Sequence, residues 1–197
     1  LAANRHQAKI VLRAAGVPVT DHLIVDRAAA ARQHQLPPPY VVKPIAAGTG
    51  VAAFAVLGER EDPPGRLLEA DWQGGEAGLI ERYAPGKTLD VVVMGDVALG
   101  VSETIPPPPG EEGEPLQNQL VTPAQISPNI YEFVQKLSVD AHHALGCRGV
   151  SRADFRFDDR PGGTGELVCL EVNTQPGMTA TSLVPELAAH TGWTFGE

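Results

Sequence analysis

Two segments near the C-terminus carry the side chains with the clearest chemistry. Residues 151–158 and 167–173 each alternate polar and apolar side chains, and a glycine-rich break separates them. Alternation of this kind has the period of a β-strand, and a glycine-rich break between two such runs predicts a hairpin. A hairpin centred on Gly162–Gly163 brings two pairs of polar residues face to face: Asp154 with Glu171, and Arg152 with Asn173.

The polar face of this hairpin has the composition of a metal site. Asp154, Glu171 and Asn173 offer two carboxylates and an amide oxygen, an all-oxygen set that suits Mg²⁺ or Mn²⁺ completed by phosphates and water. Facing residues of an antiparallel pair lie roughly 5 Å apart, so both carboxylates can reach one cation or flank two. We therefore predict a divalent metal site.

The spacing alone leaves an alternative equally open. Charges that alternate along an exposed strand often form a solvated face, on which Arg152 would pair with Asp154 and Arg156 with Asp158. The other face of the hairpin is apolar and is expected to pack on the core. Its members are Ala153, Phe155, Leu170 and Val172, with Phe155 opposite Leu170.

Three other places carry weaker signals. Lys43 followed by 48–50, Gly-Thr-Gly, combines a cation with backbone NH groups that can cradle phosphate. Glu81 lies at the end of a predicted strand, and Gly177 follows the second hairpin strand in a Pro-Gly pair. Each of these features is more often an ordinary turn or strand end.

The elements that must position these groups alternate between helix and strand. Hydrophobic periodicity and cap residues predict both kinds, and the stretch 106–123, rich in Pro, Gly and Glu, predicts a loop with no packed element. The predicted helices cover 4–15, 28–34, 66–72, 127–145 and 182–190. The predicted strands, besides the hairpin, cover 18–25, 40–44, 51–57, 79–83, 88–94 and 97–105.

The composition of the chain argues against several classes of protein and partner. The chain has 197 residues, 43% hydrophobic content and a net charge of −9, which is typical of a globular protein and argues against a nucleic-acid partner. No apolar run reaches the roughly 20 residues that a membrane span needs. The two cysteines, Cys147 and Cys169, show no metal spacing and suit a reducing compartment, so we expect a cytoplasmic protein.

The order of these motifs resembles one family. Lys43-Pro44 with its glycine loop, the segments 80–83 and 149–155, and the long block 170–179 with 182–185 are similar to the successive motifs of the D-alanine-D-alanine ligases, members of the ATP-grasp superfamily. The resemblance implies an α+β fold of two small antiparallel lobes with the nucleotide between them, here divided as 1–95 and 96–197. It corresponds to the middle and C-terminal domains of such a ligase.

The resemblance also implies roles. ATP phosphorylates one D-alanine and the amine of a second displaces phosphate, with Arg152 and Gly177 stabilising the charge that develops. Ser182 and Leu183 would hold the second substrate, and two Mg²⁺ ions would lie on Asp154, Glu171 and Asn173. The residues that would bind ATP are Lys43, Thr49, Glu81, Arg82, Tyr83, Ala84 and Leu170. The sequence leaves open whether two copies form a homodimer.

The chain also departs from the family pattern. The glutamate expected to bind ribose falls at Thr88, an expected lysine falls at Arg5, and 106–123 contains neither the Lys nor the Tyr of the usual closing loop. The family's N-terminal domain is expected to be missing. Two hypotheses follow: a D-alanine-D-alanine ligase, or a non-catalytic or repurposed ATP-grasp module that binds Mg-ATP or serves as a scaffold.

Overall fold

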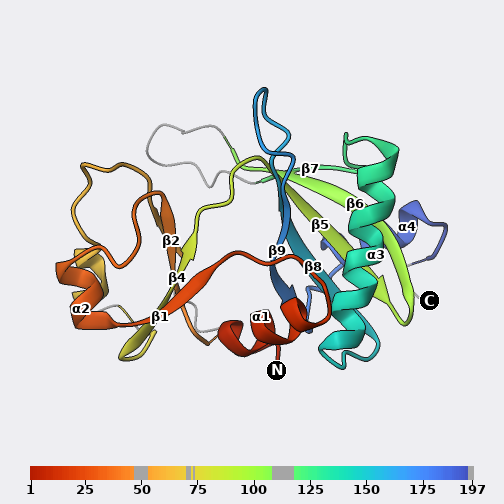
Figure 1. Ribbon diagram of the computed structural model, residues 1–197. Coiled ribbons are helices and arrows are strands. Elements are labelled where there is room, and N and C mark those ends of the chain that lie inside the picture. The colour runs from red at the N-terminus through yellow and green to blue at the C-terminus, as the bar shows by residue number, and fades with distance from the viewer. Residues whose placement is uncertain (47–52, 70–71, 73, 108–117, 195–197) are drawn as a thin grey trace.

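The chain folds around two antiparallel sheets that lie side by side (Figure 1). The computed structural model describes residues 1–46, 53–69, 72, 74–107 and 118–194. The smaller sheet has the strand order β1-β4-β2-β3. Its strands are β1 (His22–Asp26), β2 (Tyr40–Pro44), β3 (Phe54–Val56) and β4 (Ala77–Arg82), and it is accompanied by helix α2 (Arg27–Arg32) and a 3-10 helix (Gly65–Leu68).

The larger sheet carries the predicted metal hairpin. Its strand order is β7-β6-β5-β8-β9, so the hairpin strands β8 and β9 lie at one edge and β5 pairs with β8. The strands are β5 (Lys87–Met94), β6 (Val97–Ile105), β7 (Gln119–Val121), β8 (Val150–Phe157) and β9 (Leu167–Asn173).

Alternation along these strands separates a covered face from a partly open one. Leu89, Val91 and Phe155 are fully buried in one core with Val134 and Ala141 of helix α3 (Pro128–Ala144), which lies across that face (Figure 1). On the opposite face, helix α4 (Leu183–His190) covers only one end, through a small cluster of Val92, Leu99, Val184 and Leu187. The polar side chains of β5, β8 and β9 occupy the rest of that second face.

Helix α1 (Arg5–Ala14) begins where the sequence indicates. The Asn4 side chain caps it by accepting a hydrogen bond from the Gln7 amide, and Leu12 is buried in the core of the larger sheet. The helix contacts β9 and α3, although the chain continues from it into the smaller sheet.

Three expectations about elements were wrong. Residues 119–121 of the stretch predicted as a loop form β7, because their alternating backbone groups pair with β6. The helix predicted over 66–72 is a single 3-10 turn, and the strand predicted over 18–25 begins only at His22. A three-residue edge strand and a one-turn helix are both too short to leave a clear period in the sequence.

The change of sheet comes between β4 and β5, one strand before residue 95. The division into 1–95 and 96–197 therefore stays a prediction about lobes, while sheet membership divides the chain at the 83–86 connection. Among the described residues, no helix is long and apolar enough to cross a membrane.

Candidate active site

The hairpin has the predicted register at its polar end. Asp154 faces Glu171 and Arg152 faces Asn173. Beyond Asp154 the register shifts, so that Phe155 faces Cys169 and not Leu170, which corrects the expected pairing. A bulge at Leu170 accounts for the shift, since one extra residue in β9 is left without a partner. The bulge lets Glu171 share a face with Asp154 while Cys169 stays fully buried.

A third carboxylate extends this row, and the sequence reading missed it. Asp90 of β5 lies directly across from Asp154 on the other side of β8, so three neighbouring strands bring Asp90, Asp154 and Glu171 into line. Asp90 is buried and accepts a hydrogen bond from the Thr104 hydroxyl. The alternation over 88–92 places Asp90 on the polar face of its strand, but only the pairing of β5 with β8 brings it beside Asp154.

The Asp154 carboxylate of the hairpin is paired with an arginine of the same strand. Arg152 donates to both oxygens of Asp154, over 2.6 and 2.8 Å. Of the two ion pairs expected for a solvated face, the one between Arg152 and Asp154 is therefore formed. Arg156 instead donates to the Gly86 carbonyl oxygen. The pKa of Asp154 is raised to about 7, because burial, together with the charges of Asp90 and Glu171, outweighs the lowering effect of Arg152.

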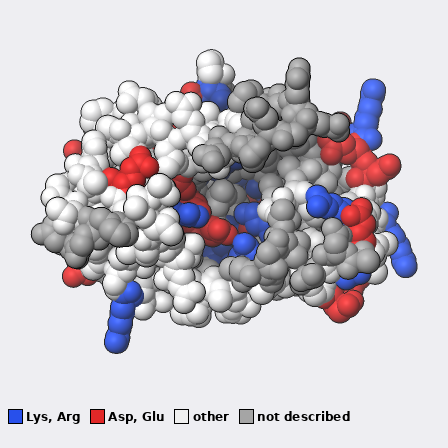
Figure 2. Space-filling model, turned by 180° about the vertical axis from the view of Figure 1, so that it is seen from behind, with Lys and Arg blue, Asp and Glu red and all other residues white. Residues whose placement is uncertain are grey.

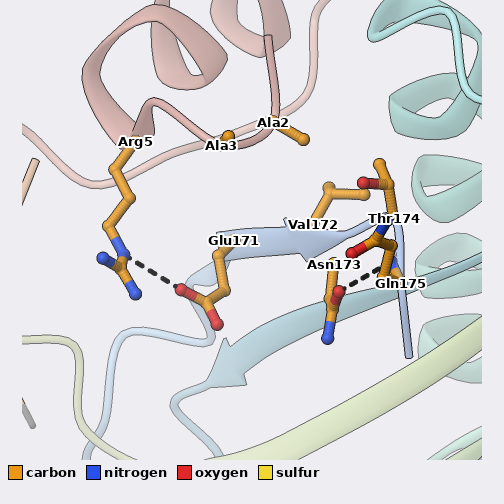
Figure 3. A pocket seen from close by; sticks show the side chains of 8 residues that line it. All are labelled: Ala2, Ala3, Arg5, Glu171, Val172, Asn173, Thr174 and Gln175. Carbon is orange, nitrogen blue, oxygen red and sulfur yellow. Dashed lines mark hydrogen bonds and ion pairs between the residues drawn. The ribbon is translucent and has the colours of Figure 1, made fainter. Parts of the chain in front are cut away.

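A cavity of about 330 Å³ adjoins Glu171 and Asn173 (Figure 3). Arg5 reaches over it from α1 and donates to Glu171 across 3.1 Å, and it also donates to the carbonyl oxygens of Pro44 and Ala46. The amide oxygen of Asn173 accepts from the Gln175 backbone NH. Arg5 thus links the metal face to the strand that leads into the glycine loop.

The donor set suits a hard cation in its chemistry. Asp154, Glu171 and Asn173 supply only oxygens, and two of the three lie on directly facing residues. Within the described part of the chain, no group of three or more His, Cys, Asp and Glu side chains is arranged to hold a metal by itself. A cation here would therefore need ligands from the substrate or water as well, as Mg²⁺ usually does.

A second cluster lies in the smaller sheet, around Glu81. Its carboxylate is 2% exposed, and its Oε2 atom is 3.2 Å from the ammonium of Lys43 and 3.3 Å from that of Lys9. The Thr20 hydroxyl donates to the same oxygen over 2.9 Å. Burial by itself would raise the pKa of Glu81, but Lys43, Lys9 and Thr20 outweigh it and lower the pKa, so the group is ionised.

The connection between β4 and β5, which joins the two sheets, contacts the tip of the β8–β9 hairpin. Arg82 forms an ion pair of 2.6 Å with Glu166, and Tyr83 donates its backbone NH to the Pro39 carbonyl oxygen. Gly86 lies so close to Phe157 that a Cβ atom would stand 2.0 Å from the carbonyl oxygen of Phe157. The Glu166 ion pair and the close approach to Phe157 hold the 82–86 backbone, which contains Ala84, against the larger sheet, and the Pro39 bond ties it to the smaller one.

The segment after β9 folds into a small hydroxyl-rich turn. Ser182, the N-cap residue of α4, accepts a hydrogen bond from the Thr179 NH and bonds the Thr179 hydroxyl over 2.6 Å. A Cβ on Gly177 would come within 2.8 Å of the Ser182 oxygen, so only glycine fits there without movement. Leu183 is half-buried against the α4 cluster.

The structure therefore brings the predicted residues into three groups. The metal face collects Arg152, Asp154, Glu171 and Asn173, the smaller sheet joins Lys43 to Glu81, and the turn joins Gly177 to Ser182. Thr49 lies outside the described residues. Figure 2 shows a hollow in the middle of one face, with acidic and basic side chains gathered inside it. Sequence reasoning missed Asp90, Lys9 and Thr20.

Comparison with solved structures places this architecture in the ATP-grasp class. A D-Ala:D-Ser ligase, VanG from Enterococcus faecalis, superposes with a TM-score of 0.81 at 25% identity, over 99% of this chain and 59% of that one. A D-alanine-D-alanine ligase from Bacillus anthracis, solved with ATP, gives a TM-score of 0.77 at 23% identity, over 98% of this chain and 62% of that one, and supports the fold alone.

The sequence comparisons narrow the class to one family. The family model described as "D-ala D-ala ligase C-terminus" matches residues 11–197. D-alanine-D-alanine ligases from Methylobacterium radiotolerans and Rhizobium meliloti are 55% and 48% identical, over the whole of this chain and 66% of each relative. The chain belongs to the D-alanine-D-alanine ligase family, as its motifs predicted, and it spans just under two thirds of the length of these curated relatives.

Proposed function

We propose that this chain carries the nucleotide and metal sites of a ligase that joins two D-alanines at the expense of ATP, for synthesis of a peptidoglycan precursor. The observation that carries the proposal is the cross-strand pair of Asp154 and Glu171, with Asn173 beside them at the edge of a cavity. Family membership supports the same reaction, since the curated relatives are named for it.

The proposed metal and nucleotide contacts follow from where each side chain lies. Asp154, Glu171 and Asn173 would hold Mg²⁺, two ions by resemblance, with Mn²⁺ as a substitute. Bound Mg²⁺ would neutralise charge on the phosphates of ATP during transfer. Lys43 would contact phosphate, and the connection formed by Arg82, Tyr83 and Ala84 would line the base together with Glu81 and Leu170. Thr49 of the glycine loop is proposed to add a phosphate contact.

The residues proposed to act on the substrates include one that is bonded to another side chain in this structure. Arg152 donates to both Asp154 oxygens, so it must give up at least one of these bonds before its guanidinium can reach a substrate oxyanion. Gly177 would add a backbone NH to the same oxyanion, and such fixed donors act on charge as it develops. Ser182 and Leu183 would hold the carboxylate of the second D-alanine through the N-terminal end of α4.

A second candidate is a module that binds Mg-ATP without turnover. It is favoured by the stretch 106–123, which offers four consecutive prolines and acids where the family's closing loop carries Lys and Tyr. A site that stays open exposes a reactive acyl-phosphate to water. We accordingly expect the chain by itself to bind Mg-nucleotide weakly and to release little phosphate.

Phosphate release in the presence and absence of D-alanine separates the two candidates. A ligase should release phosphate only when D-alanine is present, and Asp154→Asn should abolish the release. Asp96→Asn is the matched control, because Asp96 is an exposed carboxylate whose ion pair, within the described part of the chain, is with His143. Mg-ATP binding in a calorimeter without D-alanine-dependent release would favour the module, and absence of Mg-ATP binding would overturn both candidates.

We further propose a cytoplasmic location, where ATP is available. The support is that Cys147 and Cys169 are both free thiols, as is usual in a reducing compartment. The proposal includes small-molecule partners alone, with neither nucleic acid nor membrane. Light scattering of the same sample would decide whether two copies form a homodimer.

A further inference from the structure

The carboxylate of Glu81 is held from one side only. Lys9, Lys43 and Thr20 all direct their donors at Oε2. The other oxygen, Oε1, is buried and is the one buried side-chain polar atom in the described part of the chain that has no hydrogen-bond partner. A buried acceptor without a partner costs free energy, so this oxygen is suited to a donor that arrives with a ligand.

Lys9 has no task in the proposed reaction, yet it is one of the most buried side chains of the protein. It is 1% exposed, and its ammonium donates to the Thr20 hydroxyl over 2.9 Å. Burial lowers the pKa of Lys9, and the charge of Glu81 acts against that lowering. An ammonium buried in this way is retained only where it is paired and hydrogen-bonded.

We propose that Lys9 and Thr20 are positioning residues that lock the Glu81 carboxylate, so that Oε1 is the single free acceptor presented to an incoming nucleobase. Such an acceptor selects a base with an exocyclic amino group over one with a carbonyl at the same position. The inference rests on the proposed function, and it adds the residues that create base selectivity.

The geometry explains why both residues are needed. Thr20 accepts from Lys9 and donates to Glu81, so the three side chains form a relay that fixes the carboxylate plane. Without either member, the carboxylate can turn and exchange its two oxygens, after which Lys43 can engage either one. The free acceptor would then no longer hold one position, and an amino group would lose its advantage.

The test compares ADP with IDP, whose bases differ at position 6, an amino group against a carbonyl, and at the adjacent N1, which accepts in adenine and carries a hydrogen in hypoxanthine. Affinities would be measured by calorimetry with Mg²⁺ for the wild type, Lys9→Met and Thr20→Val. The wild type should prefer ADP by roughly 10- to 100-fold, the value of one hydrogen bond to a charged group. Both variants should lose most of that ratio, chiefly through weaker ADP binding.

Two matched controls separate positioning from general damage. Lys136→Met removes an exposed lysine of α3, and Ser138→Ala removes a buried hydroxyl that bonds the Val134 carbonyl oxygen in the same helix. Both controls should keep the wild-type ratio. Because Thr20→Val preserves side-chain volume and both lysines, it decides the question if Lys9→Met does not fold.

The outcomes distinguish this inference from the proposed function. If the wild type binds neither nucleotide, the proposed nucleotide site fails and the inference fails with it. If the wild type prefers ADP and Thr20→Val keeps that preference in full, the proposed function stands and the positioning role is refuted. Equal binding of ADP and IDP by the wild type refutes selectivity through Glu81.

Discussion

Gly86 lies where the β4–β5 connection passes the tip of the β8–β9 hairpin, and its replacement by alanine measures how tightly the two segments are held. Its φ angle is +95°, and a Cβ would stand 2.0 Å from the Phe157 carbonyl oxygen and 2.7 Å from the Cα of Asp158. Both neighbours are backbone atoms, so neither can move aside by a change of rotamer. The substitution must displace either the connection or the hairpin.

The expected cost has two parts. An L-residue in the left-handed region costs about 1–2 kcal/mol, and forcing an extra methyl group into a packed place adds about 1–3 kcal/mol. Gly146→Ala supplies the control for the first part alone, because Gly146 also has a positive φ, +66°, but a Cβ there would meet nothing within 4 Å. Gly86→Ala should therefore lose about 1–3 kcal/mol more than Gly146→Ala.

Urea unfolding followed by tryptophan fluorescence gives both values. With a slope of about 2 kcal/mol per molar urea, the midpoint of Gly86→Ala should lie about 0.5–1.5 M below that of Gly146→Ala. Because the displaced connection carries Arg82 and Tyr83, ADP affinity should fall in Gly86→Ala and stay unchanged in Gly146→Ala. Equal midpoints for the two variants would refute the reasoning that the hairpin tip clasps the connection.

Other predictions concern titration, thiol access and the ion pair between the sheets. Burial lowers the pKa of His142, so the folded state favours the neutral ring, and stability should be lost as pH falls below about 6.5. His142→Gln should flatten that loss in urea unfolding series between about pH 7 and 5, and an unchanged slope would contradict it. Burial raises the pKa of Cys169 to about 12, whereas Cys147 is only partly buried, so a thiol reagent should label Cys147 first and Cys169 only on unfolding. Glu166→Gln, at a pair about 40% exposed on both sides, should cost less than about 1 kcal/mol in the same assay. A larger loss of stability would mean that the ion pair between Arg82 and Glu166 also holds neighbouring contacts in place.

The sequence predicted the part of the site that local pattern determines. Alternation and a glycine-rich break were sufficient to place Asp154 opposite Glu171, because a hairpin of adjacent strands has few registers that keep one face apolar. The bulge at Leu170 was not predictable, since an extra residue leaves the alternation on either side intact. Its effect is confined to the pairing beyond Asp154.

What the sequence could not supply is contact between distant segments. Asp90 joins the metal face only because β5 pairs with β8, and Lys9 reaches Glu81 only because α1 lies against both sheets. Local periodicity carries no information on which strands become neighbours. Recognition of the family provided the roles of several residues, but it did not indicate the relay through Thr20.

Arg5 and Lys9 are separated by one turn of α1, and each ends on a carboxylate of a different sheet. Residues four apart leave the same side of a helix, about 6 Å apart along its axis. Through this spacing α1 connects the two sheets, and the separation of Arg5 and Lys9 along the helix sets the distance between the base end and the phosphate end of the proposed site. One residue inserted between the two cations would rotate one of them by about a further 100° around the helix axis and would break the contact of α1 with at least one sheet.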